Sequence, residues 1–359
     1  MCLNSTVLCR RGMTKSARLI TMAVFKSTSK GLFMTQNTRN CCLSLFASLA
    51  LLASASALAQ SDTYPVKPIT IVVGYPPGGS TDLTGRTIGV ELSKRLGVPV
   101  VIENIGGAGG AIGAQKVVNA APDGYTLLAG ANNEIAISRL VSAAVKYQIK
   151  DFTPIGLIAS QPMVLVASSK SGVKSADQFL SLVKGNPGKY SYGSSGVGTA
   201  LHLAGEMVKD QGGLFMTHIP YRGVAPLAND LLGGNIEFGV FVLSSGLPHI
   251  RSGRVVALGT TEAKRSATTP EIPALAENPK LKGIDINVWF ALMGPAHLPE
   301  PVLAKLKKAL AESLQSPDLR KKLEESGSAI APLNVDMPKF LKDETAKYQR
   351  IVDFAKIKE

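Results

Sequence analysis

Short apolar runs alternate with helical patterns along most of the chain. Ile69–Val73 and Val98–Ile102 are short, β-branched and nearly free of charge, which is typical of buried parallel strands. Between them, apolar residues recur every fourth position over Ser80–Leu96 and predict a helix that Gly97 ends. Further strands are predicted at Tyr125–Ala129 and Ile155–Ala159. Strands that alternate with helices predict an α/β fold whose sheets are rich in parallel pairs.

A second cycle of strands and helices begins after Gln161-Pro162, and an apolar strand at Asn287–Gly294 is expected to return the chain to the first sheet. We therefore expect two lobes, each with a roughly five-stranded sheet flanked by helices. Residues 60–162 and 286–359 would form the first lobe and residues 163–285 the second. Two chain crossings make a hinge, and the cleft between the lobes is where a ligand would be enclosed.

Two glycine-rich turns, YPPGGSTD and ENIGGAGGAIGA, each follow a predicted strand and lead into a helix. Glycine permits the tight, positive-φ backbone that other residues resist. The first amides of each helix have no intrahelical partner, so two such N-termini facing one cleft would bind an anion, most simply a carboxylate. Ser80 or Thr81 is the expected N-cap of the first helix, and Asp82 lies in its first turn, where the helix dipole favours an acid. A third small-residue turn, Ser194–Thr199, opens a helix in the second lobe.

The first 59 residues have the pattern of an export leader. They contain seven bases and no acid, and from Met34 they show a short basic segment, an apolar run and the small-residue site Ala57-Leu58-Ala59. The apolar run is too short for a membrane span of ~20 residues. We expect cleavage after Ala59 and an upstream extension over residues 1–33, with Met13 and Met22 as other possible starts.

Removal of the leader changes the charge and the chemistry of the chain. The full chain has 39 bases and 26 acids, whereas the mature chain would have 32 bases and 26 acids, a net charge of +6. Its bases are scattered, which argues against nucleic-acid binding and suits a small anionic ligand. All four cysteines lie in the leader, so thiol and disulfide chemistry are excluded from the mature chain. The four histidines show no metal-ligand spacing, and neither a metal nor a cofactor is expected.

Two enzyme-like interpretations of these turns fail on spacing. A dinucleotide site needs a third glycine where Ile112 stands, and no phosphate-binding GK[ST] motif is present. A serine hydrolase elbow around Ser195 needs glycine where Val197 stands, and no acid is placed to orient His202. Simple tight turns without a ligand remain the alternative for the glycine segments. Packing or surface roles remain open for His202, for Arg222 in its loop, and for Trp289 and Phe290 in the return strand.

The motifs YPPGGSTD, ENIGGAGGAIGA, APDGYTLLAG, SSGVG, HLAGE, PYRG, DLLGG and LPHIRSGR, in this order, resemble the Bug-type (TctC-like) solute receptors of tripartite tricarboxylate transporters. The resemblance covers the chain from about Tyr64 to the last helix. It implies a two-lobed, type II periplasmic binding protein, not an enzyme, that acts as a monomer and delivers a carboxylate-containing metabolite to membrane permease subunits. In that family the two glycine loops hold a ligand carboxylate through backbone amides and waters.

Carried over to this sequence, the resemblance predicts the ligand-binding residues Tyr75, Pro77, Gly78, Gly79, Ser80, Thr81, Asp82, Gly107, Ala108, Gly109, Gly110, Ala111, Gln161, Ser194, Ser195, Gly196, Thr199, His202 and Phe241.

One departure from the family pattern bears on the ligand. Family members often have an Asp-Asn pair where this chain has Phe241-Val242. An aspartate there would suit an ammonium group of the ligand, whereas Phe241 carries no negative charge and offers an apolar face. We therefore expect a mono- or dicarboxylate without an ammonium group. Asn132-Asn133-Glu134 also differs from the usual small-polar run of the family. A receptor that serves a sensor or signalling partner, rather than a transporter, is the alternative function.

Overall fold

The computed structural model describes residues 64–357 of the 359-residue chain. The predicted leader, its possible start sites and the cleavage after Ala59 lie outside these residues. The part that is described contains no helix both long and apolar enough to cross a membrane.

The first lobe is built on strands in the order β2-β1-β3-β9-β4, with β10 beside β4. Its first three strands are parallel, as expected for an α/β unit, whereas β9 pairs antiparallel with both β3 and β4. Helices α3 and α4 both contact β1 and keep that strand almost entirely buried. The elements of this lobe are β1 (Ile69–Val73), α3 (Ser80–Leu96), β2 (Val100–Asn104), α4 (Ala111–Val118), β3 (Thr126–Ala131), α5 (Ser138–Val141), β9 (Asn287–Pro295), α10 (Glu300–Ser313), α11 (Pro317–Glu325) and β10 (Ala329–Ile330).

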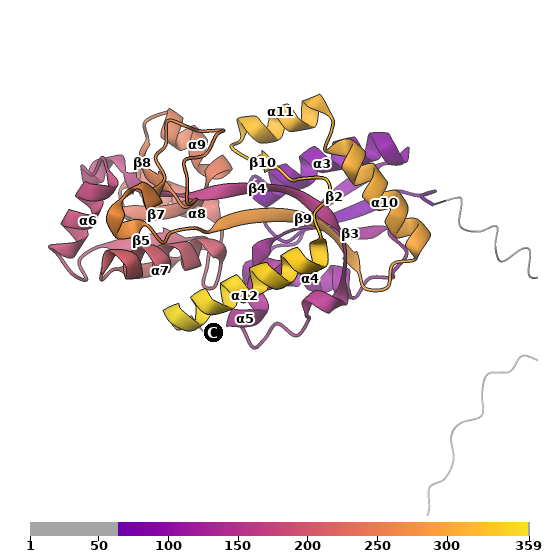
Figure 1. Ribbon diagram of the computed structural model, residues 1–359, viewed down its shortest axis with the longest axis horizontal. Helices are drawn as coiled ribbons and strands as arrows, with labels where there is room; N and C mark the ends of the chain where they lie inside the picture. The colour runs from indigo at the N-terminus through magenta and orange to yellow at the C-terminus, as the bar shows by residue number, and fades with distance from the viewer. Residues whose placement is uncertain (1–63, 358–359) are drawn as a thin grey trace, which may run out of the picture. The chain divides into compact units, whose positions relative to one another are not determined.

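The second lobe repeats this plan with a smaller sheet. β5 pairs in parallel with β6 and β7, and β4 lies between β7 and β8 in antiparallel pairing. Helices α6 to α9 surround these strands (Figure 1). The elements are α6 (Ala176–Lys184), β5 (Ser191–Ser194), α7 (Ala200–Gly212), β6 (Thr217–Pro220), α8 (Val224–Gly233), β7 (Phe238–Val242), α9 (Leu243–Arg251) and β8 (Val255–Thr260).

A single 17-residue strand, β4 (Phe152–Ser168), runs through both lobes (Figure 1). The sequence predicted two separate strands interrupted at Gln161-Pro162, and this prediction was wrong. Residues up to Pro162 pair with β9, and residues from Met163 onward pair with β7 and β8. Proline has no N–H to donate to a ladder, and here it stands where the strand changes partners. The predicted return strand at Asn287–Gly294 is confirmed as β9.

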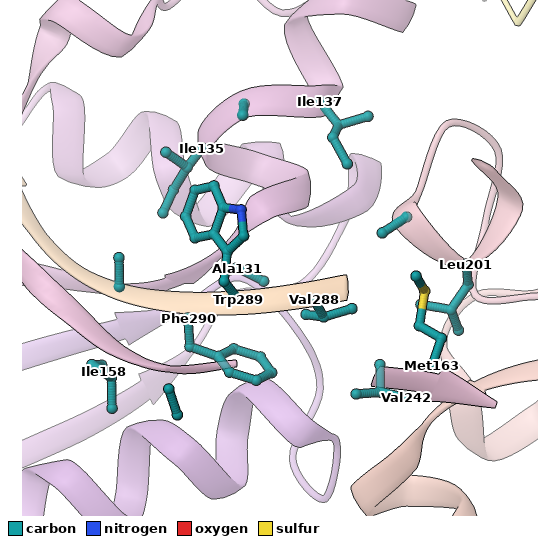
Figure 2. Packing of buried hydrophobic residues seen from close by; sticks show 14 of the residues in the cluster. Ala131, Ile135, Ile137, Ile158, Met163, Leu201, Val242, Val288, Trp289 and Phe290 are labelled. Atoms are coloured by element: carbon teal, nitrogen blue, oxygen red, sulfur yellow. The ribbon is translucent and has the colours of Figure 1, made fainter. Parts of the chain in front are cut away.

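The two faces of β9 pack on different parts of the core. Figure 2 shows Trp289 directed toward Ile135 and Phe290 on the opposite side of the strand, as the two-residue period of a strand requires. The indole Nε1 of Trp289 donates to Glu344 of the last helix, α12 (Met337–Ala355), at 2.8 Å. Both aromatic side chains are buried, so they belong to the core.

Candidate functional site

A cavity of about 500 Å³ lies between the two lobes. Its walls come from the first glycine turn, from the ends of β3 and β9, and from the starts of three second-lobe helices. The lining residues are Tyr75, Pro76, Pro77, Gly78, Gly79, Ser80, Thr81, Ala131, Asn133, Val288, Ser195, Leu201, Arg222, Gly223, Val224, Ala225, Pro226, Ala228, Val242, Ser244, Ser245, Pro248 and His249. The cavity is large enough for a small metabolite.

The first glycine turn presents the N-terminus of α3 to the cavity. Gly79, not the expected Ser80 or Thr81, is the N-cap of α3, and no side chain caps the helix. Gly78 takes a positive φ of 92°, and a Cβ at Gly78 or Gly79 would meet no atom within 4 Å. The amides of this first helical turn have no intrahelical partner and are available to an anion.

Asp82 does not line the cavity, and its side chain forms hydrogen bonds that fix the first turn. Its carboxylate accepts hydrogen bonds from the Gly78 amide (2.9 Å), Asn104 Nδ2 (2.9 Å) and Arg86 Nε (3.0 Å). Burial acts to raise the pKa of Asp82, but the hydrogen bonds from Arg86, Gly78 and Asn104 together lower it below the ordinary value of 3.8. Asp82 therefore fixes the backbone of the turn as an ionised group.

The second glycine turn packs against the residues around the first turn and does not line this cavity. None of Gly107, Ala108, Gly109, Gly110 and Ala111 lines the cavity. A Cβ on Gly110, whose φ is 93°, would lie 3.0 Å from Cδ and Oε2 of Glu134. A Cβ on Gly74 would lie 2.8 Å from Cα of Gly110. The structure thus packs this turn tightly against the strand that carries the first turn.

A hydrogen-bonded group that the sequence did not reveal joins the two turns to the second lobe. The Tyr75 hydroxyl donates to the Gly109 carbonyl at 2.8 Å and accepts from Asn133 Nδ2 at 2.8 Å. Asn133 Oδ1 in turn accepts from the backbone amide of Ala200, the first residue of α7, at 2.7 Å. Glu134, buried beside them, was noted only as part of a departure from the family pattern. No local sequence signal could have paired these residues, because they meet only through the tertiary fold.

In the third turn only Ser195 lines the cavity. Ser194 is fully buried, with its Oγ 2.7 Å from Nε2 of His218. Thr199 caps α7, and the amide of Gly198 donates to Nδ1 of His202 at 3.0 Å. These residues, with Gly196 between them (φ 144°), shape the turn from inside the second lobe.

The ring of His202 stacks on that of His218 with centroids 3.8 Å apart. Desolvation lowers the pKa of His202 to about 4, so the ring is neutral and can accept at Nδ1. The Oγ of Ser195 contacts Thr199 Oγ1 and no histidine within hydrogen-bonding distance, which leaves it without the base that a nucleophilic serine needs.

The second lobe adds groups that favour an anion. Arg222 and the first residues of α8 line the cavity, together with Ser244 and Ser245 at the start of α9. The hydroxyl oxygens of both serines are buried and have no hydrogen-bond partner within residues 64–357. The sequence left the role of Arg222 open between a solvated loop charge and a charge in the cleft. Its place in the PYRG motif was the sequence feature that pointed to the cavity.

Two predicted residues, Gln161 and Phe241, lie behind the second-lobe wall of the cavity. Gln161 is buried, and its Oε1 accepts from the amide of Ser244 at 2.8 Å, which fixes the start of α9. Phe241 is fully buried in the second-lobe core, and the neighbouring Val242 lines the cavity instead. The ring of Phe241 lies 6.3 Å from that of His249, which does reach the cavity.

The charges of the lining have one sign. No aspartate or glutamate is among the lining residues, whereas Arg222 and three helix N-termini are. Helix N-termini carry partial positive charge, so the cavity is electrostatically suited to a carboxylate. Within the described residues, no group of three His, Cys, Asp or Glu side chains could hold a metal ion.

Comparison with known proteins agrees with this architecture. The model of the tripartite tricarboxylate transporter family receptor (TctC) matches residues 85–357. The chain is 32% identical to the protein BugT of Bordetella pertussis over 303 residues, which is 84% of this chain and 93% of that protein.

Two solved structures are similar across nearly their whole length. The periplasmic binding protein BugD has a TM-score of 0.77 and 31% identity, covering 82% of this chain and 99% of its own. An R. palustris protein solved with adipate has a TM-score of 0.78 and 30% identity, with the same coverage. The chain therefore belongs to the tripartite tricarboxylate transporter family of receptors, which are two-lobed periplasmic binding proteins and not enzymes.

Proposed function

We propose that the protein is a periplasmic receptor that encloses a small mono- or dicarboxylate without an ammonium group and delivers it to the permease subunits of a tripartite tricarboxylate transporter. The observation that carries the proposal is the cavity lining, which combines Arg222 and three helix N-termini with no acidic side chain. An ammonium group would find no carboxylate partner there, whereas a carboxylate would find amides, hydroxyls and a guanidinium. The similar R. palustris structure with adipate supports the same class of ligand.

The proposed mechanism is ligand-driven closure of the two lobes. The first lobe comprises residues 60–162 and 286–359, and the second comprises residues 163–285. Ser80 and Thr81 belong to one lobe and Arg222 and Ser245 to the other, so a bound ligand contacts both walls of the cavity. A ligand that makes more contacts in the closed state shifts the population toward that state. We also propose that the protein is exported, is cleaved after Ala59 and acts as a monomer.

A thermal-shift screen followed by isothermal titration calorimetry tests the ligand class. Adipate, succinate, malate, benzoate, aspartate and glutamate form the panel. We expect plain carboxylates to raise the melting temperature and the amino acids to leave it unchanged. Stabilisation by amino acids with none by plain carboxylates would contradict the proposal.

A matched pair of arginine variants tests the site. A hydrogen bond to a charged group contributes about 1.5–3 kcal/mol, so Arg222→Gln should weaken carboxylate binding roughly ten- to a hundredfold. Arg251 is also exposed but does not line the cavity, and Arg251→Gln should bind like the parent. Equal affinity of the two variants would remove Arg222 from the site.

A further inference from the structure

Glu134 is a buried carboxyl group that the proposed function leaves without a role. It is 1% exposed, lies at the start of the π-helical turn Asn133–Ile137 and does not line the cavity. Its Oε1 accepts from the amide of Ala131 at 2.8 Å, and its Oε2 lies 3.2 Å from the hydroxyl of Tyr75. A Cβ on Gly110 would lie 3.0 Å from Oε2 of Glu134, so the carboxyl group lies next to both glycine turns.

The protons in this group can be counted from its hydrogen bonds. The amide of Ala200 can only donate, so the side-chain atom of Asn133 that faces it is the oxygen, and the Nδ2 of Asn133 therefore donates to Tyr75. The carbonyl of Gly109 can only accept, so the single proton of the Tyr75 hydroxyl lies in that 2.8 Å contact. The contact between Tyr75 and Oε2 of Glu134 is then left without a proton unless Glu134 supplies it.

We propose that Glu134 is held as a neutral carboxylic acid that donates to Tyr75, and that this proton positions the two glycine turns and the interlobe contact of Asn133. With the proton in place, every polar atom of the group has a partner. Without it, either the Gly109 carbonyl or the buried Oε2 loses its hydrogen bond, which is costly in a dry site.

The surroundings of Glu134 favour the neutral form. Desolvation raises the pKa of Glu134 from 4.5 to about 7, against the lowering effect of hydrogen bonds from the backbone amides of Ala131 and of Glu134 itself. The ionisable side chains in contact with Glu134 are Tyr75 on the first turn and Tyr147, whose hydroxyl donates to the Glu134 carbonyl at 2.6 Å; Arg139 lies on the adjoining helix α5. Among residues 64–357 no Lys, Arg or His, Arg139 included, forms an ion pair with this carboxyl group. A buried acid without a cationic partner is stabilised by keeping its proton.

The consequence for the ligand rests on the proposed function. Tyr75 and Asn133 both line the cavity, and Asn133 also binds the start of α7 in the other lobe. Loss of the Glu134 proton would loosen these contacts and place a negative charge behind a site that binds an anion. Carboxylate affinity should therefore fall as the pH rises through the pKa of Glu134.

The proton is tested first without any ligand, by comparing the parent with Glu134→Gln. Infrared difference spectra at pH 6 should show a protonated carboxyl band in the parent that the variant lacks. At Glu134 the folded parent binds one proton more than the unfolded chain between the ordinary pKa of 4.5 and about 7, so the stability that this group contributes is fully present below pH 4.5 and is lost as the pH rises through about 7. The unfolding constant of the parent relative to the variant should rise about tenfold per pH unit there.

An absent acid band at pH 6, or parallel stability profiles of parent and variant, would overturn the proposal. These ligand-free results do not depend on which metabolite the receptor binds, so they separate this proposal from the proposed function.

Titrations with adipate at several pH values then measure how far protonation of Glu134 changes carboxylate affinity. The parent should lose affinity severalfold between pH 6 and 8.5, and Glu134→Gln should show a smaller change, because glutamine keeps a donor for Tyr75 at every pH. Glu262→Gln is the matched control, since burial also raises the pKa of Glu262, which does not line the cavity. A pH dependence that survives Glu134→Gln or disappears in Glu262→Gln would exclude Glu134 as the positioning residue for the ligand.

Discussion

The two glycine turns follow the same plan in the sequence but require glycine for different reasons. At Gly78 and Gly79 an added Cβ would meet nothing within 4 Å, and both residues line the cavity. At Gly110 an added Cβ would press on the buried carboxyl of Glu134. The first turn is open, so that a ligand can approach its amides, whereas the second is crowded by the protein itself at Gly110. A glycine-rich turn after a strand thus does not by itself identify a ligand contact.

The acids that accompany the two turns differ in the same way. Asp82 is surrounded by donors, and these hydrogen bonds lower its pKa. Glu134 accepts from backbone amides only and lies beside the hydroxyl of Tyr75, and burial raises its pKa to about 7. One acid is stabilised as an anion that orders the open turn, and the other is suited to be a neutral group that packs under the crowded turn. Substitutions at each turn can separate these roles.

The largest effect is expected for Gly110→Ala in the second turn. The positive φ costs roughly 1–2 kcal/mol with an alanine, and the collision with Glu134 adds roughly 1–3 kcal/mol. We expect the free energy of unfolding, measured in urea, to fall by roughly 3 kcal/mol. Gly172→Ala is the matched control, because Gly172 has φ 75° but open space around it. Equal losses in the two variants would show that the second turn is not crowded.

A smaller loss is expected for Asp82→Asn. Asparagine keeps the shape but loses the charge and one acceptor, and hydrogen bonds to charged groups contribute about 2 kcal/mol. Since the pKa of Asp82 is lowered by folding, its contribution is present above the ordinary value of 3.8 and is lost as the pH falls through the lowered value. The parent and the variant should therefore differ in urea denaturation at pH 7 and converge in strong acid.

The exposed pair of Asp343 with Lys339 provides the control for Asp82. Asp343→Asn should change stability by less than about 0.5 kcal/mol, because exposed ion pairs contribute little. A loss at Asp343 equal to that at Asp82 would mean that the charge, and not the geometry of the first turn, accounts for the effect.

The local patterns predicted the elements well. The helix Ser80–Leu96 has the predicted limits, because apolar periodicity and a terminal glycine are properties of the local sequence. The continuity of β4 through Pro162 could not be predicted, since a proline usually interrupts a strand and only the exchange of partners at this point accommodates it.

Local sequence patterns predicted only part of the candidate site. The predicted residues of the first turn other than Asp82, together with Ser195, line the cavity, but the second turn, His202 and Phe241 do not. Spacing gives the conformation of a turn, not the direction it faces after packing. Asn133 and Glu134 were recognised only as a departure from the family pattern, because their partners Tyr75 and Ala200 are far away in the sequence.

The smallest change in stability, and the sharpest separation of the two turns, is expected for Gly79→Ala. Gly79 has a φ of −83°, so alanine is not strained there, and its Cβ meets no protein atom within 4 Å. The free energy of unfolding should stay within about 0.5 kcal/mol of the parent. The new methyl group would enter the space beside the α3 amides, and we expect adipate affinity in calorimetry to fall roughly tenfold, or about 1.4 kcal/mol. Gly172→Ala should show the opposite combination, with reduced stability and unchanged affinity, because its strain lies outside the cavity. If Gly79→Ala bound adipate as tightly as the parent, the open space at the first turn would not be where the carboxylate lies.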